Sequence, residues 1–135
     1  MLSESLGDYL ESIYLLERDH GVARATEIAK RMNVRMSSVT CAMKSLAGKS
    51  LVNYDPYHVI TLTARGRRVA RDLVRRHKTL ARFFTEVIGL DSESADRNAC
   101  HVEHAIEPEA LEGLVAFLAR ERAPRGDDKR KRTHK

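Results

Sequence analysis

Apolar residues recur at every third or fourth position through most of this chain, so its fold is expected to be largely helical. The first such segment covers residues 5–19, where the apolar positions would form one face of an amphipathic helix. Ser3 or Ser5 can cap the start of this helix, and Gly21 suits its end. The first element is therefore predicted to be a helix with one buried face.

Five further segments show the same spacing and complete the predicted set of helices. They cover residues 25–32, 36–47, 64–88, 93–105 and 108–121. A turn at residues 33–34 separates the second helix from the third. Thr63, Ser92 and Pro108 suit the starts of the last three helices. The positions expected to face the core from the third and fourth helices are Val39, Met43, Leu46, Val69, Leu73, Leu80, Phe84 and Ile88.

Between the third and fourth helices the pattern changes to that of strands. Residues 51–54 and 57–62 are rich in β-branched and aromatic side chains, and residues 55–56 provide the turn between them. Helix, turn, helix and a two-stranded ribbon follow one another in the order of a winged helix-turn-helix. The predicted fold class is therefore mainly α, with an N-terminal winged helix-turn-helix followed by a C-terminal helical domain.

Length and composition limit the class of protein. A chain of 135 residues is expected to form one compact unit or two very small ones. The predicted domains are a winged helix-turn-helix at residues 1–64, a helical domain at residues 65–121 and a disordered basic tail at residues 122–135. No apolar run reaches the ~18 residues of a membrane span, the start has no basic leader, and two cysteines cannot form a disulfide framework. We therefore expect a cytoplasmic protein, and not a membrane protein, a secreted mini-protein or a large enzyme.

The 24 basic and 19 acidic residues are segregated along the chain. Residues 23–78 contain thirteen bases and three acids, whereas residues 1–22 and residues 79–121 are both acidic overall. Solubility is the alternative explanation, but it does not require so strong a local bias. The basic block predicts a surface that binds a polyanion, and the acidic segments on either side could attract cations.

The position of the third helix makes DNA the expected polyanion. The second helix of a helix-turn-helix enters the major groove with its N-terminal residues near the bases, and hydroxyl side chains there can bond bases or phosphates. The candidate DNA-binding residues are Arg35, Met36, Ser37, Ser38, Thr40 and Lys44, together with Tyr57 at the tip of the predicted wing. Arg65, Arg67 and Arg68 are expected to contact phosphates. The alternative is a generic three-helix core with a hairpin.

Three side chains near the end of the fifth predicted helix could bind a transition metal. Cys100, Glu103 and His104 lie at positions i, i+3 and i+4, on one face of that helix. Asp8 and Glu11 are paired at i and i+3 on the first helix, although such a pair is more often simply solvated. Carboxylates that converge without a cation repel one another. A cluster of these residues would therefore imply a bound cation or a strongly perturbed pKa.

Five short motifs are shared with one known family. They are DYLESIYLL at residues 8–16, SSVT at residues 37–40, LTARG at residues 62–66, RRH at residues 75–77 and ACHVEH at residues 99–104. In these motifs the chain resembles the diphtheria-toxin-repressor family of metal-dependent transcription regulators, and within it the short manganese-transport-regulator branch. The resemblance implies a homodimer that binds double-stranded operator DNA when loaded with Mn(II) or Fe(II), and that represses metal-uptake genes.

The resemblance also implies which side chains bind the metal. Asp8 and Glu11 match the first-helix carboxylates of the manganese branch, and His77 matches the family's histidine on the fourth helix. Glu103 and His104 match the ligands on the fifth helix. The helical domain would then provide both dimerisation and metal binding.

Cys100 departs from the manganese branch, which has a glutamate at this position, and matches the iron branch. Ala81 and Asp96 stand where iron regulators have a carboxylate and a histidine. Oxygen ligands suit Mn(II), whereas a thiolate favours Fe(II), Co(II) or Zn(II). The predicted metal is therefore Mn(II) or Fe(II), with Co(II) or Zn(II) as further ions that could bind in vitro.

The predicted function is that of a metal-dependent transcriptional repressor, with the divalent ion as corepressor and with no enzymatic activity, organic cofactor or membrane partner. One alternative is a metal-independent winged-helix regulator that senses a small organic ligand. A second is a small metallo-hydrolase with Glu103 as its base, although the chain contains no catalytic motif. A third is a redox switch at Cys41 or Cys100, although neither lysine nor arginine flanks Cys100 to lower the pKa of its thiol.

Overall fold

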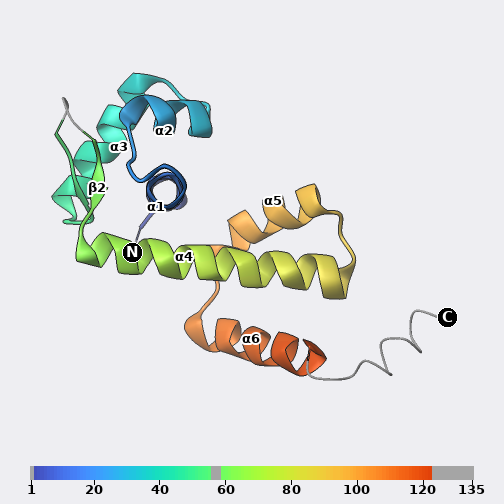
Figure 1. Cartoon of the computed structure of the whole chain (residues 1–135). Helices are drawn as coiled ribbons and strands as arrows, with labels where there is room; N and C mark the ends of the chain where they lie inside the picture. The colour runs from blue at the N-terminus through green and yellow to red at the C-terminus, as the bar shows by residue number, and fades with distance from the viewer. Residues whose placement is uncertain (1, 56–58, 123–135) are drawn as a thin grey trace. The chain divides into compact units, whose positions relative to one another are not determined.

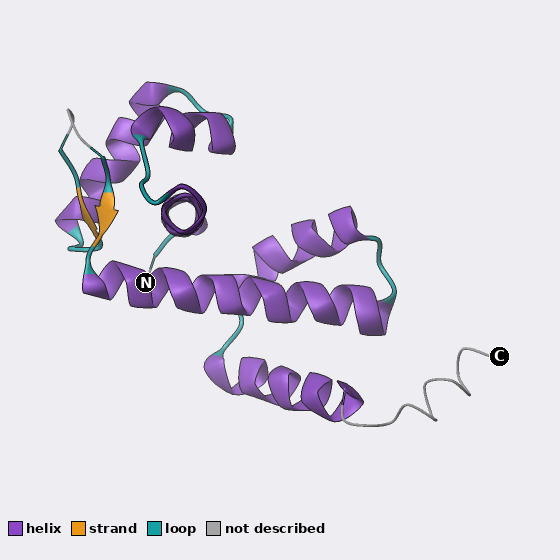
Figure 2. Cartoon of the chain, in the orientation of Figure 1, coloured by secondary structure: helices purple, strands orange, loops and turns teal. Residues whose placement is uncertain are grey.

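The computed structural model describes residues 2–55 and 59–122, and these are mainly helical (Figure 1, Figure 2). The mainly α fold class predicted from the sequence is therefore confirmed. The chain divides into two compact units, residues 1–75 and residues 76–135, and the division falls within the long helix α4. None of the described helices is both long and apolar enough to cross a membrane. The predicted disordered tail, beyond its first residue, lies outside the described residues.

Helix α1, Glu4–His20, extends one residue beyond each end of the helix that the sequence predicts. Ser3 caps its N-terminus, because the serine hydroxyl accepts the backbone N–H of Leu6 at 3.2 Å. Gly21 ends the helix in a left-handed conformation with φ of 84°, which glycine adopts without strain. Its backbone N–H donates to the carbonyl of Glu17 at 2.8 Å and so satisfies one of the last carbonyls of the helix.

Helices α2, Ala25–Met32, and α3, Met36–Gly48, form the predicted helix-turn-helix. Asn33 ends α2 with φ of 57°, and the backbone N–H of Val34 donates to the carbonyl of Ala29 at 3.0 Å. This left-handed turn directs α3 away from α2 after only a short connection. The buried core of the first unit includes Leu10, Ile13, Ile28, Val39, Met43, Leu46 and Ile60. The three positions predicted to face the core from α3 are among them.

The wing has fewer paired residues than the sequence predicts. Strand β1, Val52–Asn53, pairs antiparallel with β2, Thr61–Leu62, and the first residue of β1 lies opposite the last residue of β2. The predicted strands, residues 51–54 and 57–62, are therefore too long in their described parts. Ile60, which the prediction places in the second strand, pairs with a different segment of the chain.

Two backbone hydrogen bonds explain the short ladder. The carbonyl of Leu51 accepts the N–H of Thr63 at 3.1 Å, which closes the base of the wing. Ile60 pairs instead with Ala23, whose carbonyl accepts the Ile60 N–H at 2.8 Å. The connection between α1 and α2 thus supplies a third backbone segment to the sheet. No local pattern at Ala23 predicts this bridge.

Helix α4, Ala64–Arg82, starts at the threonine that the sequence predicts as its cap. The hydroxyl of Thr63 accepts the N–H of Gly66 at 2.9 Å and donates to the carbonyl of Ser50 at 2.7 Å. Gly66 is buried, and a Cβ at this position would overlap the carbonyl oxygen of Leu51. The first turn of α4 therefore lies directly on the backbone that precedes β1, an approach that only glycine allows.

The second unit contains the end of α4, the π-helical segment η1, Phe83–Ile88, and helices α5, Ser92–Glu103, and α6, Pro108–Arg122. Segment η1 contacts α5, which reverses direction after it (Figure 1). Asp91, and not the predicted Ser92, caps α5, because its carboxylate accepts the backbone N–H of the third residue of the helix at 2.8 Å. The buried apolar residues of this unit are Leu80, Ala95, Ala99, Leu111 and Leu118.

The prediction of one α-helix over residues 64–88 is wrong in its last six residues, which form η1. The hydroxyl of Thr85 donates to the carbonyls of Ala81 and Arg82 at 3.0 and 3.2 Å, and so competes with the regular backbone ladder. The helix widens at this point. Of the predicted core positions on this helix, Leu73 and Leu80 are buried, Val69 and Phe84 are partly buried, and Ile88 is exposed.

Candidate metal centre and nucleic-acid interface

A fully buried carboxylate connects two helices of the second unit. Glu103 occupies the last turn of α5, and its Oε1 lies 2.7 Å from Nδ1 of His77 on α4. Its Oε2 lies 3.5 Å from Nε2 of His104, the residue that follows α5 and whose side chain is 9% exposed. The structure thus brings together three of the six predicted metal ligands, with two imidazoles around one carboxylate.

Among the residues that the structure describes, Oε2 of Glu103 finds no hydrogen-bond partner. The contact with His104, at 3.5 Å, does not meet the geometry of a hydrogen bond. A buried carboxylate oxygen without a donor is costly unless a positive charge compensates it. A carboxylate oxygen and an imidazole nitrogen that face each other are both good ligands for a first-row divalent metal. The residues present therefore fit a divalent cation.

Cys100 and Asp96 lie on the same face of α5 as Glu103, at spacings of three and seven residues. Cys100 is partly buried, so its thiol adds a soft donor near the end of the helix. Asp96 is exposed, and its Oδ1 lies 3.3 Å from Nε2 of His77. Both imidazole nitrogens of His77 therefore face carboxylates. Asp96 was not among the predicted ligands, although its position four residues before Cys100 is a signal that could have found it.

Arg76 is a second residue of this centre that the predicted set omits. Its Nη1 donates to the carbonyl of Glu103 at 3.2 Å and to the carbonyl of Ile106 at 2.8 Å. These bonds hold the C-terminal end of α5 and the turn that follows it, where the helix carries partial negative charge. Arg76 therefore orients the backbone that carries Glu103. In the sequence Arg76 is one of several arginines in a basic segment, and no local pattern distinguishes it from the others.

The remaining predicted ligands lie in the other unit. Asp8 and Glu11 are partly buried on α1, one turn apart as their spacing requires.

Helix α3 presents most of the predicted DNA-binding residues to solvent. Arg35, Met36, Ser37, Ser38 and Lys44 are exposed, and Thr40 is partly buried. Met36 is 45% exposed. The opposite face of α3 is buried, so the helix is anchored by one side and free on the other. Tyr57 lies outside the described residues.

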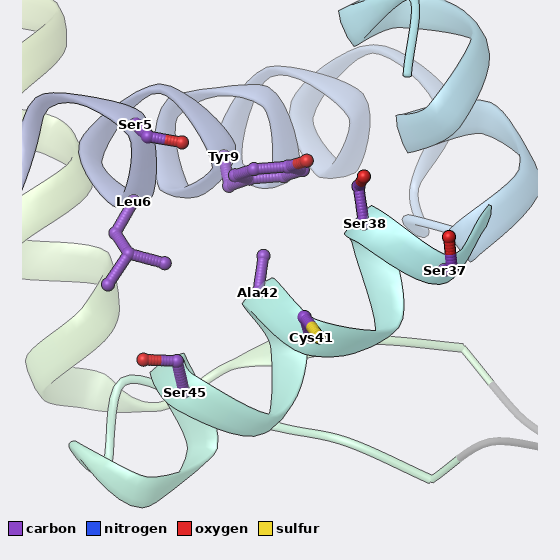
Figure 3. A pocket seen from close by; sticks show the side chains of 8 residues that line it. All are labelled: Ser5, Leu6, Tyr9, Ser37, Ser38, Cys41, Ala42 and Ser45. Atoms are coloured by element: carbon purple, nitrogen blue, oxygen red, sulfur yellow. The ribbon is translucent and has the colours of Figure 1, made fainter. Parts of the chain in front are cut away.

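A groove of 590 Å³ runs between α1 and the exposed side of α3 (Figure 3). Its walls are formed by Ser5, Leu6 and Tyr9 of α1 and by Ser37, Ser38, Cys41, Ala42 and Ser45 of α3. Most of these side chains carry a hydroxyl or a thiol, so the groove offers hydrogen-bonding groups but no charge. Ser37 and Ser38 belong both to this groove and to the predicted DNA-binding set.

Two of the three arginines expected to contact phosphates have partners inside the first unit. Nη1 of Arg65 donates to the carbonyl of Lys49 at 3.0 Å. Nη1 of Arg67 lies 2.7 Å from Oε1 of Glu17. These two side chains therefore help to hold the start of α4, whereas Arg68 is exposed.

Comparison with known proteins identifies relatives along the whole described chain. Residues 1–60 match the family model described as iron dependent repressor, N-terminal DNA binding domain. Residues 63–131 match the model described as iron dependent repressor, metal binding and dimerisation domain. The two matches together cover nearly the entire sequence.

Two curated relatives match over most of their own length. The chain is 42% identical over 118 residues to an uncharacterized HTH-type transcriptional regulator of Methanocaldococcus jannaschii, covering 87% of this chain and 94% of that protein. It is 34% identical over 132 residues to the HTH-type transcriptional regulator MntR of Shouchella clausii, covering 96% and 92%.

Solved structures of similar proteins share the fold. The manganese regulator SloR matches with a TM-score of 0.75 and 30% identity over 84% of this chain. A manganese-dependent transcriptional repressor solved in complex with manganese matches with a TM-score of 0.76 and 28% identity, also over 84% of this chain. The matched region is about half of each solved chain, 53% and 52% respectively.

Proposed function

The chain belongs to the iron-dependent repressor family of metal-dependent DNA-binding regulators, and on this premise we propose that Mn(II) or Fe(II) sets its affinity for operator DNA. The observation that carries the proposal is the buried carboxylate of Glu103. Within the described residues, one of its oxygens lacks a hydrogen-bond partner and lies 3.5 Å from an imidazole.

The proposed ligands combine hard and soft donors from both units. They are Asp8, Glu11, His77, Cys100, Glu103 and His104. Three carboxylates in one site favour Mn(II), and the thiol of Cys100 favours Fe(II), Co(II) or Zn(II). Because no donor type dominates, the ion bound in the cell would depend on which metal is available.

The proposed switch follows from where the ligands lie in the chain. Asp8 and Glu11 belong to the unit that carries α3, whereas the other four ligands belong to the second unit. When bound, a divalent cation supplies the positive charge that lets these carboxylates share one site. Without that charge the acids of the two units repel each other. The position of α3 would therefore depend on whether the six side chains are brought together.

Dimerisation would turn that dependence into DNA recognition. In a homodimer held by the helices of residues 65–121, the two α3 helices must be about 34 Å apart to enter successive turns of one duplex. The proposed contacts to double-stranded operator DNA are Arg35, Met36, Ser37, Ser38, Thr40, Lys44 and Tyr57. Residues 1–64 form the proposed DNA-binding domain. By linkage, metal and DNA must strengthen each other's binding equally.

The metal step is tested by calorimetric titration of the full chain with Mn(II), Fe(II) under anaerobic conditions, Co(II) and Zn(II). Wild-type protein is expected to bind each ion, and Glu103→Gln is expected to lose most of the affinity. Glu93→Gln is the matched control, because it removes the same charge from an exposed position on the same helix.

The DNA step uses duplexes selected from a random 40-base-pair pool in the presence of Mn(II), then measured again with a chelator at the same salt concentration. Salt must be held constant because it changes DNA affinity greatly by itself. We expect the chelator to weaken binding of wild-type protein and of Glu93→Gln, and to leave the already weak binding of Glu103→Gln unchanged. Equal affinity with and without metal in wild-type protein would contradict the proposed switch.

A further inference from the structure

Basic side chains line the solvent face of α4 between residues 68 and 75. Arg68, Arg71 and Arg75 follow one another at spacings of three and four residues, so they lie on one face of the helix, and all three are exposed. The whole helix contains eight bases and one acid, Asp72. We refer to the surface formed by the three arginines as the α4 basic face.

Arg68 and Arg71 differ from the neighbouring arginines of α4 in their polar contacts. Neither Arg68 nor Arg71 makes an ion pair or hydrogen bond with any residue in the described ranges, 2–55 and 59–122. Their neighbours in sequence behave differently, because Arg65 and Arg67 bind the carbonyl of Lys49 and the carboxylate of Glu17. The structure therefore separates arginines that stabilise the first unit from arginines that face water.

Arg68 and Arg71 lie three residues apart on α4 and repel each other slightly unless an anion lies against them. The spacing of the α4 basic face fits one kind of anion well. Seven residues of helix rise by about 10 Å, and one DNA strand carries a phosphate about every 3.4 Å of helix axis. Arginines spaced along that distance can thus face consecutive phosphates, and guanidinium groups bind phosphate oxygens in pairs of hydrogen bonds.

We propose that the α4 basic face binds the phosphate backbone of duplex DNA, independently of base sequence and in addition to the contacts made by α3. The proposal rests on the proposed function only in taking DNA as the partner of the first unit. The phosphates could belong to the operator duplex or to a second duplex.

The test measures how DNA affinity depends on salt. Each phosphate contact contributes about −0.9 to the slope of log affinity against log salt concentration. The double variant Arg68→Gln/Arg71→Gln should therefore flatten the slope by about 1.8 and weaken binding about tenfold or more at low salt. The control, Arg97→Gln/Arg120→Gln, removes the same charge from exposed positions on α5 and α6 and should keep the wild-type slope. Both variants replace exposed side chains, and matching thermal melts would confirm that they fold.

The measurements use the full chain and mixed-sequence duplexes of 20 and 40 base pairs, each with Mn(II) and with chelator. A gain in affinity from 20 to 40 base pairs that the double variant loses would support contact with one continuous duplex. Energy transfer between donor-labelled and acceptor-labelled 20-base-pair duplexes, lost in the double variant, would support contact with a second duplex. Either result supports the α4 basic face as a phosphate-binding surface.

An unchanged salt slope in the double variant would overturn the proposal. So would an unchanged slope accompanied by altered self-association in sedimentation velocity, because the face would then contact an acidic surface of another copy of the chain. The proposed metal switch fails by a different result, namely equal wild-type affinity with Mn(II) and with chelator. The comparison of slopes between variants remains decisive in that case, since non-specific electrostatic binding requires no metal.

Discussion

The guanidinium of Arg67 lies 2.7 Å from Oε1 of Glu17, and this pair joins the start of α4 to the last turns of α1. The Glu17 side chain is only 15% exposed. Its second oxygen accepts the backbone N–H of Leu62 in β2 at 3.4 Å. One carboxylate therefore connects the first helix, the wing and the fourth helix of the first unit.

We expect Glu17→Gln to lower the free energy of unfolding by about 1–2 kcal/mol, because it removes the charge that two donors share in a largely buried place. Urea denaturation monitored by circular dichroism measures the change. Arg18→Gln is the control, since it breaks the pair of Arg18 with Asp19, in which both side chains are about half exposed. A Glu17 variant as stable as the Arg18 variant would show that the pair does not stabilise the unit.

Gly66→Ala should destabilise the first unit by about 3 kcal/mol or more, because the new Cβ would overlap the carbonyl oxygen of Leu51 and neither backbone can move freely. Gly113→Ala in α6 is the matched control. Nothing lies within 4 Å of a Cβ at that exposed position, so alanine should stabilise the helix by about 0.5–1 kcal/mol. Thermal melts of both variants give the comparison, and a Gly66 variant with a wild-type melting temperature would contradict the close contact.

Cys100 is expected to bind Co(II) through its thiolate, which produces an intense near-ultraviolet charge-transfer absorption that oxygen and nitrogen ligands do not produce. Cys100→Glu should abolish this absorption and shift the preference of the protein from Co(II) toward Mn(II), because carboxylate is the harder ligand. Cys41→Ser, at an exposed position on α3, should leave the absorption intact. If the Cys41 variant loses the absorption instead, the thiolate ligand is Cys41 and the assignment to Cys100 is wrong.

Arg76→Gln should increase amide hydrogen exchange in residues 103–107, because two carbonyls at the end of α5 lose their charged donor. The affinity for Mn(II) should fall as well, since the backbone that carries Glu103 becomes less ordered. Arg97→Gln, an exposed arginine earlier in α5, serves as the control and should change neither measurement. Unaltered exchange at residues 103–107 in the Arg76 variant would remove the role assigned to this side chain.

Much of the candidate site could be anticipated from spacing on a single helix. Glu103, His104 and the cysteine three residues before Glu103 must share one face of α5, because their intervals match the helical repeat. Spacing gives no such guide where the partner comes from another segment. His77 and Asp96 are nineteen residues apart, and their contact at 3.3 Å exists only because α5 returns beside α4. No local pattern encodes such a pair.

The amino-acid sequence alone determined the succession of helices, most of their boundaries and the face that each one buries, because these depend on side chains three or four residues apart. It also determined the charge of α4. Tertiary structure decided which of those charges are used inside the fold, so that Arg65 and Arg67 stabilise it while Arg68 faces solvent. It likewise shortened the wing, widened the end of α4 and buried Glu103 beside two imidazoles. Each of these outcomes depends on atoms brought together from distant parts of the chain, which sequence spacing cannot specify.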